Sequence, residues 1–502
     1  MTEKKKLLFW IDFGFLHFGI ANYLQKKTDA EFYAIIDIND KAKKFFEKQK
    51  LVEFKKSWYY LDETADFSSK PDLEYLKSFE KRYGIDLWSI AFTDRAFFRF
   101  NKYHKFSEVE IFSLLEKECK FFEKILEESK PDYLLLWVTN AHNTHLLHQM
   151  CKSKGVKILM LSQTRFGNRF IVSHDFDKFD KEDIEKISND HKEISDEKLI
   201  EYLEKYDPLK IIQKKSKEGY SEKKSSRYKA LAKFFFSGTS ESYKKRFSYY
   251  GRSKSALLKE KILRKIQKVK IESYIDKKFL KKIQPETKFV YFPLHSEPER
   301  ALLIGAPFFD DQFSMILYVS KCIPAGYKLY VKDHPAMKKY MWRSKSYYQN
   351  LIDVPNVEFL HPSVNRDDIM KKCDLVIGVG GTPVLEACFF KKPSIMFQEN
   401  DMSIIPSIHS VENIKDLPQI IKKTLSEKVD TQYLKNYLKI VDSCTFEVDL
   451  WSLNTDFAYT FGFKGPDIDG ELPVNKIKKF LEKHKDIFEK IADAHLSKIN
   501  KG

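Results

Sequence analysis

The chain has 502 residues, a formal net charge of +16, 43% hydrophobic and 15% aromatic residues. Its 17 glycines and 17 prolines are too few for a fibrous or low-complexity protein, so most of the chain is expected to fold. At about 150 residues per domain, this length predicts two or three domains. No uninterrupted apolar stretch of the sequence approaches the roughly 18 residues that a membrane-spanning helix needs.

The six cysteines have neither a CxxC pair nor the spacing of a metal site, and four of them lie in apolar or helical stretches. This pattern predicts reduced, buried thiols and a cytoplasmic protein. Near the N-terminus, Asp12 ends the apolar run 7–11 after five residues, which is too short for the core of a signal peptide. We therefore expect this run to form the first β-strand.

The positive charge is concentrated in one segment. Residues 210–282 hold 24 Lys and Arg against 6 Asp and Glu, an excess larger than that of the whole chain. Apolar residues recur three and four positions apart in its second half, which predicts an amphipathic helix over at least residues 255–283. The segment is either a solvated helical linker or the binding site of an anionic partner. A membrane inner leaflet attracts such a segment by about 1 kcal/mol per nearby Lys or Arg. No common nucleic-acid motif accompanies it, so no nucleic acid is expected.

Strands and helices alternate on both sides of the basic segment. On its N-terminal side, strands are predicted at 7–11, 31–38, 133–138 and 156–161. On its C-terminal side, strands are predicted at 288–294, 328–332, 357–360, 375–379 and 394–397. Gly14 and Gly19 are expected in the turn after the first strand. Such alternation is typical of α/β proteins with parallel sheets covered by helices on both faces.

One loop of the second sheet suits a phosphate. The sequence at 380–383 is Gly-Gly-Thr-Pro, and a predicted helix containing Glu386 follows it. Gly380 and Gly381 let the backbone approach a ligand, Thr382 is expected to be the N-cap, and the helix N-terminus presents unpaired N–H groups. Taken alone, this pattern is equally that of an ordinary strand-turn-helix connection with a good cap.

Two further loops follow strands on the same predicted sheet edge, where open α/β sheets bind ligands. One contains Lys332 and His334, with Arg343 a short distance along the chain. Together with the glycine turn it favours a nucleotide. The other contains His295 and two carboxylates, of which Glu299 is one, and it suits sugar hydroxyls or acid/base chemistry.

These motifs resemble, in order and spacing, those of the bacterial capsule polysaccharide biosynthesis glycosyltransferases. The matching stretches are 291–295, 298–299, 311–312, 331–335, 380–382, 385–387 and 392–395. The family includes the β-Kdo transferases that build the lipid linker of the capsule. The resemblance implies a GT-B-like α/β fold, in which two Rossmann-type parallel-sheet domains face a cleft and a basic helical insertion or linker joins them.

With this fold the chain is expected to divide into four parts. Residues 1–175 are predicted to form an N-terminal Rossmann-like domain on the acceptor side, and residues 176–285 a Lys-rich helical linker or insertion. Residues 286–440 are predicted to form a C-terminal Rossmann-like nucleotide-sugar domain. Residues 441–502 are expected to form a helical tail that returns toward the N-terminal domain.

The resemblance implies a CMP-sugar as the donor and no resident cofactor or metal. His334 would hold the donor phosphate together with Gly381 and Thr382, and Glu386 resembles the carboxylate that GT-B enzymes often place on the ribose. The donor-binding residues expected on this basis are Glu299, Lys332, His334, Arg343, Gly380, Gly381, Thr382 and Glu386.

The catalytic residues are less directly indicated. Kdo-transferring members carry an acidic pair after the last strand of the first domain, but the comparable stretch here, 161–167, has no carboxylate. Either another acid acts, Asp12 or Asp175, or the sugar and mechanism differ. His17 and His295 are the further candidates for acid/base chemistry.

We expect a metal-independent glycosyltransferase that acts on a surface-polysaccharide or glycolipid precursor at the inner face of the cell membrane. Its expected partners are a nucleotide-sugar donor, a glycan or lipid-linked acceptor, and an anionic membrane surface that binds residues 210–282. His142, His145 and His148 lie three residues apart with no acid or Cys to complete a site, so no zinc site is expected. Two alternatives are a CDP-polyol phosphotransferase of the teichoic-acid type and a catalytically inactive GT-B module that binds glycan or acts as a scaffold.

Overall fold

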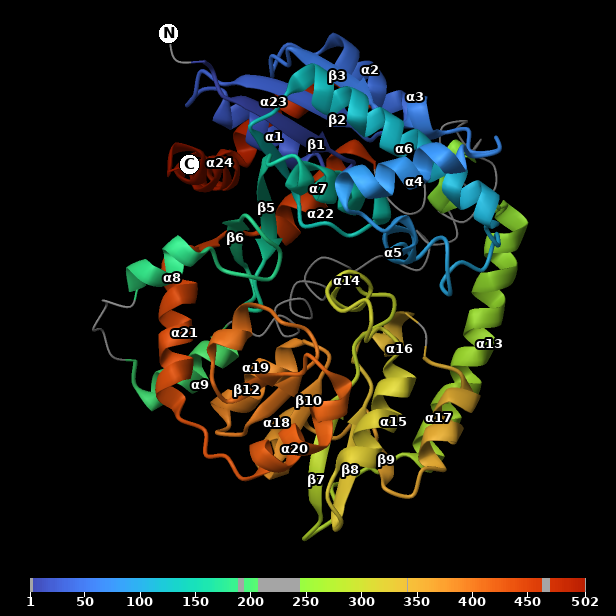
Figure 1. Cartoon of the computed structure of the whole chain (residues 1–502), viewed down its shortest axis with the longest axis vertical. Helices are drawn as coiled ribbons and strands as arrows, with labels where there is room; N and C mark the ends of the chain where they lie inside the picture. The colour runs from blue at the N-terminus through green and yellow to red at the C-terminus, as the bar shows by residue number, and fades with distance from the viewer. Residues whose placement is uncertain (1–2, 188–193, 206–243, 341, 463–469, 502) are drawn as a thin grey trace. The chain divides into compact units, whose positions relative to one another are not determined.

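The computed structural model describes residues 3–187, 194–205, 244–340, 342–462 and 470–501. The chain forms two compact units, each with its own β-sheet (Figure 1). Unit 1 comprises Met1–Asp180, Tyr206–Arg252 and Cys444–Gly502. Unit 2 comprises Lys181–Lys205 and Ser253–Ser443.

Unit 1 is built on a seven-stranded sheet with the order β3-β2-β1-β4-β5-β6-β13. Its strands are β1 (Lys6–Ile11), β2 (Glu31–Ile36), β3 (Lys56–Tyr59), β4 (Tyr133–Trp137), β5 (Lys157–Gln163), β6 (Arg169–Ser173) and β13 (Phe446–Glu447). The first five strands in this order are parallel, whereas β6 and β13 add antiparallel pairs. Side chains of β1 alternate between the faces, so Phe9 packs into one apolar layer and Trp10 into the other.

Helices cover both faces of the unit 1 sheet. One layer contains α1 (Leu16–Leu24), α2 (Asp40–Lys48), α22 (Leu450–Phe461), α23 (Val474–Lys483) and α24 (Lys485–Lys501). The other contains α3 (Tyr60–Thr64), α4 (Leu73–Tyr83), α5 (Leu87–Phe92), α6 (Glu108–Ser129) and α7 (His142–Ser153). A capping box starts the long α6, because the side chains of Ser107 and Glu110 each accept the backbone N–H of the other residue.

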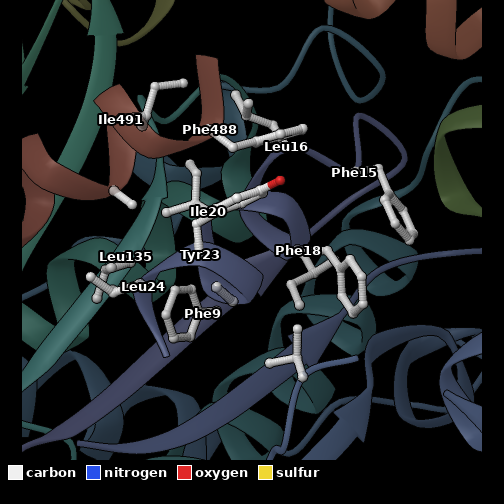
Figure 2. Close-up of a cluster of buried hydrophobic side chains, with 14 of the residues drawn as sticks. Phe9, Phe15, Leu16, Phe18, Ile20, Tyr23, Leu24, Leu135, Phe488 and Ile491 are labelled. Carbon is white, nitrogen blue, oxygen red and sulfur yellow. The ribbon is translucent and has the colours of Figure 1, made fainter. Parts of the chain in front are cut away.

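The C-terminal helices complete the core of unit 1. Figure 2 shows Phe488 and Ile491 of α24 lying over α1. The ring of Phe488 stacks on Tyr23 with their centroids 5.9 Å apart. A Cβ atom on Gly19 would lie 2.1 Å from the Phe488 ring, so glycine is what lets the two helices approach. The prediction that Gly19 belongs to a turn was wrong, since α1 already includes it.

Unit 2 is built on a six-stranded parallel sheet with the order β12-β11-β10-β7-β8-β9. Its strands are β7 (Lys288–Pro293), β8 (Tyr327–Lys332), β9 (Val357–Leu360), β10 (Leu375–Gly378), β11 (Ser394–Met396) and β12 (Ile408–Ser410). One face packs on α15 (Gln312–Cys322), α17 (Lys345–Ile352) and α20 (Leu417–Leu425), and the other on α18 (Arg366–Lys372) and α19 (Thr382–Phe389). The remaining described α-helices of the unit are α8 (Lys181–Ile187), α9 (Asp196–Lys205), α13 (Lys254–Lys278), α14 (Arg300–Leu303), α16 (Met337–Tyr340) and α21 (Thr431–Cys444).

The α/β class and the two Rossmann-type sheets are confirmed. Of the described residues in the expected linker at 176–285, residues 176–180 and 244–252 belong to unit 1, and residues 181–187, 194–205 and 253–285 belong to unit 2. The predicted division of the chain into four parts stays a prediction. Residues 444–502 belong to unit 1. The cleft implied by the resemblance stays a prediction.

A helix, α13, is present where the amphipathic helix was predicted, but most of its apolar residues are exposed in the described structure. Four of the apolar residues that predicted it are between 37% and 64% exposed, namely Leu258, Ile262, Ile266 and Val269. Ile275, near the end of the helix, is the residue of α13 that is buried. The N-terminal half of the basic segment falls largely at residues 206–243, outside the described residues.

All six cysteines are free, and four of them are buried: Cys119, Cys151, Cys373 and Cys388. Burial raises the pKa of the Cys388 thiol to about 12, which keeps it protonated and unreactive at neutral pH. Within the described part of the chain, every helix is too short or too polar to cross a bilayer.

Candidate functional site

Two of the predicted loops meet at the carboxyl edge of the unit 2 sheet. β7 and β10 are neighbours although β8 and β9 lie between them in sequence, so the strand order reverses there. Such a switch point is where open α/β sheets bind ligands. His295 follows β7 and Gly381 follows β10, and a Cβ atom placed on Gly381 would lie 2.9 Å from Cε1 of His295. The two predicted residues are therefore in contact.

Buried polar side chains hold the backbone of His295 in place. Gln312 accepts a hydrogen bond from the His295 N–H at 2.7 Å and donates one to its carbonyl at 3.3 Å. Arg343 donates to the same carbonyl at 2.8 Å and pairs with Glu297 at 3.2 Å and with Asp333. Because these contacts occupy both terminal nitrogens of the buried guanidinium, Arg343 positions the loops after β7 and β8. Its predicted contact with the donor gains no support from this placement.

The charges of His295, Glu299 and His334 act on one another. Nδ1 of His295 lies 3.2 Å from Oε2 of Glu299. Burial opposes ionisation of Glu299, but the hydrogen bond with His295 and the charges of both imidazoles hold the pKa of this carboxyl below its usual value. Burial lowers the pKa of His334. Nδ1 of His334 accepts the N–H of Ala336 at 3.1 Å, which leaves the proton of the neutral imidazole on Nε2 as a hydrogen-bond donor.

The glycine turn opens α19 without a side-chain cap. The N-cap is Gly381 in an extended conformation, so the prediction of Thr382 as N-cap was wrong by one position. Beside the turn, Asn400 is 3% exposed, and its Nδ2 has no hydrogen-bond partner among the described residues. This nitrogen would lie 3.4 Å from a Cβ atom on Gly380. A buried donor without a partner is costly, so the turn is suited to an anion that would accept from it.

A second group of predicted residues lies around Arg366. Its guanidinium is 3.0 Å from a carboxylate oxygen of Glu386, which is 5% exposed. Burial and the positive charge of Arg366 lower the pKa of Lys332 to about 8. Because the positive charges of Lys332 and Arg366 repel each other, an anion such as a phosphate would stabilise both.

In unit 1, Asp12 lies at the carboxyl edge of the sheet, directly after β1. Its Oδ1 accepts a hydrogen bond from the Gly14 N–H at 2.9 Å. Burial, helped by the negative charge of Asp37, raises the pKa of Asp12 to about 6, against the opposing effects of the Gly14 N–H and Arg246. Asp37 itself pairs with Arg246 at 2.7 Å. A carboxylate with this pKa is suited to accept a proton near neutral pH.

The other acid/base candidates of unit 1 are less well placed. His17 is 2% exposed within α1, and burial lowers its pKa to about 3 with help from the neighbouring His495. The imidazole is therefore a neutral, buried part of the core in this structure. Asp175 follows β6, which runs antiparallel to β5, so it lies at the opposite edge of the sheet from Asp12.

A buried charged network stands close to the carboxyl end of β4. Nδ1 of His142 is 2.8 Å from Asp94 and Nε2 is 2.9 Å from Glu118, which also accepts from the hydroxyl of Tyr60. Burial alone would lower the pKa of His142, but the charges and hydrogen bonds of Glu118 and Asp94 raise it to about 10. Among the described residues, no group of three or more His, Cys, Asp and Glu side chains has a metal-binding arrangement.

Sequence reasoning missed several residues of these groups. Arg366 and Asn400 carry no motif of their own, and only the packing of α18 and of the loop after β11 brings them to the site. Asp37 did carry a signal, since it follows β2 as directly as Asp12 follows β1. Its partner Arg246 is more than 200 positions away in the chain, and no local pattern predicts that pair.

A comparison with protein families agrees with these observations. Residues 183–400 match the family model described as capsule polysaccharide biosynthesis protein. This range contains His295 and every residue expected to bind the donor. No curated protein sequence matches the chain.

The chain is also similar to solved structures. The UDP-GlcNAc 2-epimerase of Methanocaldococcus jannaschii matches at 13% identity over 85% of this chain and 94% of that chain, with a TM-score of 0.24. The KpsC β-Kdo 2,7 transferase of Thermosulfurimonas dismutans matches at 11% identity over 75% of this chain and 97% of that chain, with a TM-score of 0.32. TM-scores this low say nothing about activity. The segment 183–400, which holds the site of unit 2, matches the model of capsule polysaccharide biosynthesis proteins, and the family resemblance of the sequence is confirmed.

Proposed function

We propose that the chain is a glycosyltransferase of capsule polysaccharide synthesis that moves a sugar from a CMP-sugar to an acceptor hydroxyl. The family match supports the class of protein. The contact between His295 and Gly381 carries the proposal, because it joins a phosphate-suited turn to an imidazole–carboxylate pair at the switch point of the sheet.

Different residues around this contact would bind different parts of the donor. The first turn of α19 and Nε2 of His334 offer N–H donors to the phosphate, and Lys332 and Arg366 supply positive charge. One carboxylate oxygen of Glu386 is paired with Arg366, and the carboxylate would also accept a hydrogen bond from a ribose hydroxyl. His295 and Glu299 would contact hydroxyls of the transferred sugar.

Transfer needs one base and one stabilised leaving group. Asp12 would accept the proton of the acceptor hydroxyl as the new C–O bond forms at the anomeric carbon. The bond between that carbon and the phosphate oxygen breaks, and CMP leaves with the electron pair. The positive charge of Lys332 and Arg366 would stabilise the negative charge that develops on the departing phosphate.

We also propose that the enzyme acts at an anionic membrane surface. Support comes from α13, whose basic residues flank an exposed apolar side. At about 1 kcal/mol per engaged Lys or Arg, a few contacts give micromolar binding, and salt should weaken it. Sedimentation with liposomes tests this: pelleting on anionic but not neutral vesicles, lost at high salt, is expected. Equal pelleting on both kinds of vesicle, or none, would contradict it.

A nucleotide-release assay tests the proposed reaction. The purified protein is incubated with a CMP-sugar, a CDP-polyol or a UDP-sugar and a capsule-type acceptor, and free nucleotide is measured. Release of CMP that depends on acceptor and is lost in Asp12→Asn is expected. Release from the CDP-polyol alone would instead identify a phosphotransferase, and release from none of the three would leave a binding protein.

A further inference from the structure

An aromatic pocket lies in unit 1, and none of its lining residues is among those proposed above to bind the donor or to transfer the sugar. It has a volume of about 410 Å³, within the roughly 300–1,000 Å³ of small-molecule sites. Its aromatic walls are Trp88, Phe92, Phe97, Phe98 and Phe106. Three of these side chains remain between 41% and 50% exposed, although they touch one another across the end of α5 and the loop that follows it.

The pocket is held open by its surroundings. Asp94 anchors the start of the loop, since one carboxylate oxygen accepts the Ala96 N–H at 2.7 Å and the other lies 2.8 Å from His142. The amide of Asn101 donates to the carbonyl of Ala96 and accepts from the N–H of Tyr103, each at 2.9 Å. A pocket formed before the ligand arrives binds it at a lower entropic cost.

The lining favours a hydrocarbon chain over a sugar ring. A buried sugar needs hydrogen bonds for its hydroxyls, because a polar group without a partner is costly. Here the amide of Asn101 is occupied within the loop, and Nε2 of His104 is paired with Glu110 at 2.9 Å. The aromatic faces are left as the main contact surface.

The rim of the pocket favours a negative charge. Four basic side chains of the loop are exposed, and they are Arg95, Arg99, Lys102 and Lys105. The one acid between residues 94 and 107 is Asp94, which is buried against His142. Arg99 and Lys105 line the pocket itself, as does the single carboxylate of Glu108.

We propose that this pocket binds the hydrocarbon chain of an amphiphile whose phosphate headgroup lies against Arg99 and Lys105. Its identification with the lipid of a lipid-linked acceptor rests on the proposed function, whereas the binding of an alkyl phosphate does not. The aromatic walls would take the first part of the chain. The basic loop would place the headgroup at the mouth of the pocket.

The test measures binding without any nucleotide. Dodecyl phosphate, below its critical micelle concentration, is titrated into the full chain by calorimetry and by tryptophan fluorescence, to which Trp88 is one of six contributors. Dodecyl maltoside supplies the chain without the charge, and glycerol phosphate supplies the charge without the chain. We expect saturable binding of dodecyl phosphate at one site, binding of dodecyl maltoside at least fivefold weaker, and no binding of glycerol phosphate.

Variants locate the site. Phe92→Ala and Phe98→Ala remove half-exposed rings, so the fold should persist. Each is expected to weaken the binding of dodecyl phosphate at least tenfold. Phe308→Ala makes the same change at a side chain of unit 2 that is 91% exposed, and it should have no effect. Arg99→Gln is expected to weaken the binding of dodecyl phosphate but not that of dodecyl maltoside.

Unchanged binding in both pocket variants, or equal loss in Phe308→Ala, would overturn the proposal. Equal affinity for dodecyl phosphate and dodecyl maltoside would overturn the role of the basic rim, and tight binding of glycerol phosphate would show a headgroup site without a chain pocket. If dodecyl phosphate binds as expected but no sugar transfer is found, the pocket stands and the proposed function fails.

Discussion

His295 and Gly381 lie just after two neighbouring strands of the unit 2 sheet although they are 86 positions apart in the chain, and the imidazole occupies the space that a side chain at Gly381 would need. Gly381 itself has an ordinary extended backbone, with φ −79° and ψ 170°. The requirement for glycine at this position is therefore one of space and not of backbone conformation.

Gly381→Ala is expected to displace the His295 ring and weaken nucleotide binding about tenfold, because the added methyl would lie 2.9 Å from the ring. Calorimetric titration with CMP measures the loss, and circular dichroism checks the fold. In a His295→Ala background the clash is absent, so the same substitution should cost much less there. Equal losses in the two backgrounds would show that the contact does not matter.

His334→Ala is expected to weaken CMP binding by about ten- to a hundredfold, since a lost hydrogen bond to a charged group costs about 1.5–3 kcal/mol. Burial lowers the pKa of His334, so its neutral form donates from Nε2 throughout the range above pH 6.5. The His334 contribution should stay constant between pH 6.5 and 8. A tenfold loss of that contribution per pH unit would instead mean that the imidazolium binds the phosphate.

Asp12→Asn is expected to abolish sugar transfer and leave CMP binding intact. Because the pKa of Asp12 is raised to about 6, transfer by the wild type should fall as pH drops through 6 and the base becomes protonated. A pH profile of kcat at saturating donor measures this limb. A profile that is flat between pH 5 and 7, together with an active variant, would remove Asp12 as the base.

The same shift makes a prediction about stability. A carboxyl whose folded-state pKa lies above its unfolded value stabilises the fold at low pH, and that contribution is lost as pH rises through about 6. Asp12→Asn should therefore raise the melting temperature at pH 7.5 and leave it almost unchanged at pH 4. A lower melting temperature at pH 7.5 would indicate that ionised Asp12 stabilises the fold.

His142→Gln is expected to destabilise unit 1 by about 3–5 kcal/mol near pH 6.5, because it leaves Asp94 and Glu118 buried without their cation. The folded-state pKa of His142 is about 10, so its stabilisation is complete below pH 6.5 and is lost as pH rises through 10. Urea unfolding at pH 6.5, 8 and 10 should show the difference from wild type shrinking with pH.

His361→Gln serves as the control for that series. His361 pairs with Asp276 at 3.0 Å, but the carboxylate is 61% exposed. The free energy of unfolding should therefore fall by less than about 1 kcal/mol. A loss in His142→Gln that is no larger than in His361→Gln would contradict the account of the buried network.

The sequence predicts nine of the thirteen described strands, together with the loops that follow them on the unit 2 sheet, because both signals are local. Buried parallel strands form short apolar runs, and the residues that follow them directly, such as His295 and Gly381, lie on one edge by topology. What a side chain contacts depends instead on how segments that are far apart in the sequence pack together. The ion pair of Arg343 with Asp333 and the fit of Gly19 against Phe488 both depend on such packing, and neither was predicted from the sequence.

Ligand-induced stabilisation tests the central claim, that unit 2 binds a cytidine nucleotide at the switch point of its sheet. A ligand that binds only the folded state adds RT ln(1 + [L]/Kd), about 2.7 kcal/mol at a hundred times Kd. Millimolar CMP or CDP should therefore raise the melting temperature of the wild type, and the rise should be lost in His334→Ala and Gly381→Ala. No rise with CMP or CDP beside a clear rise with UDP, or a rise that persists in both variants, would contradict the account.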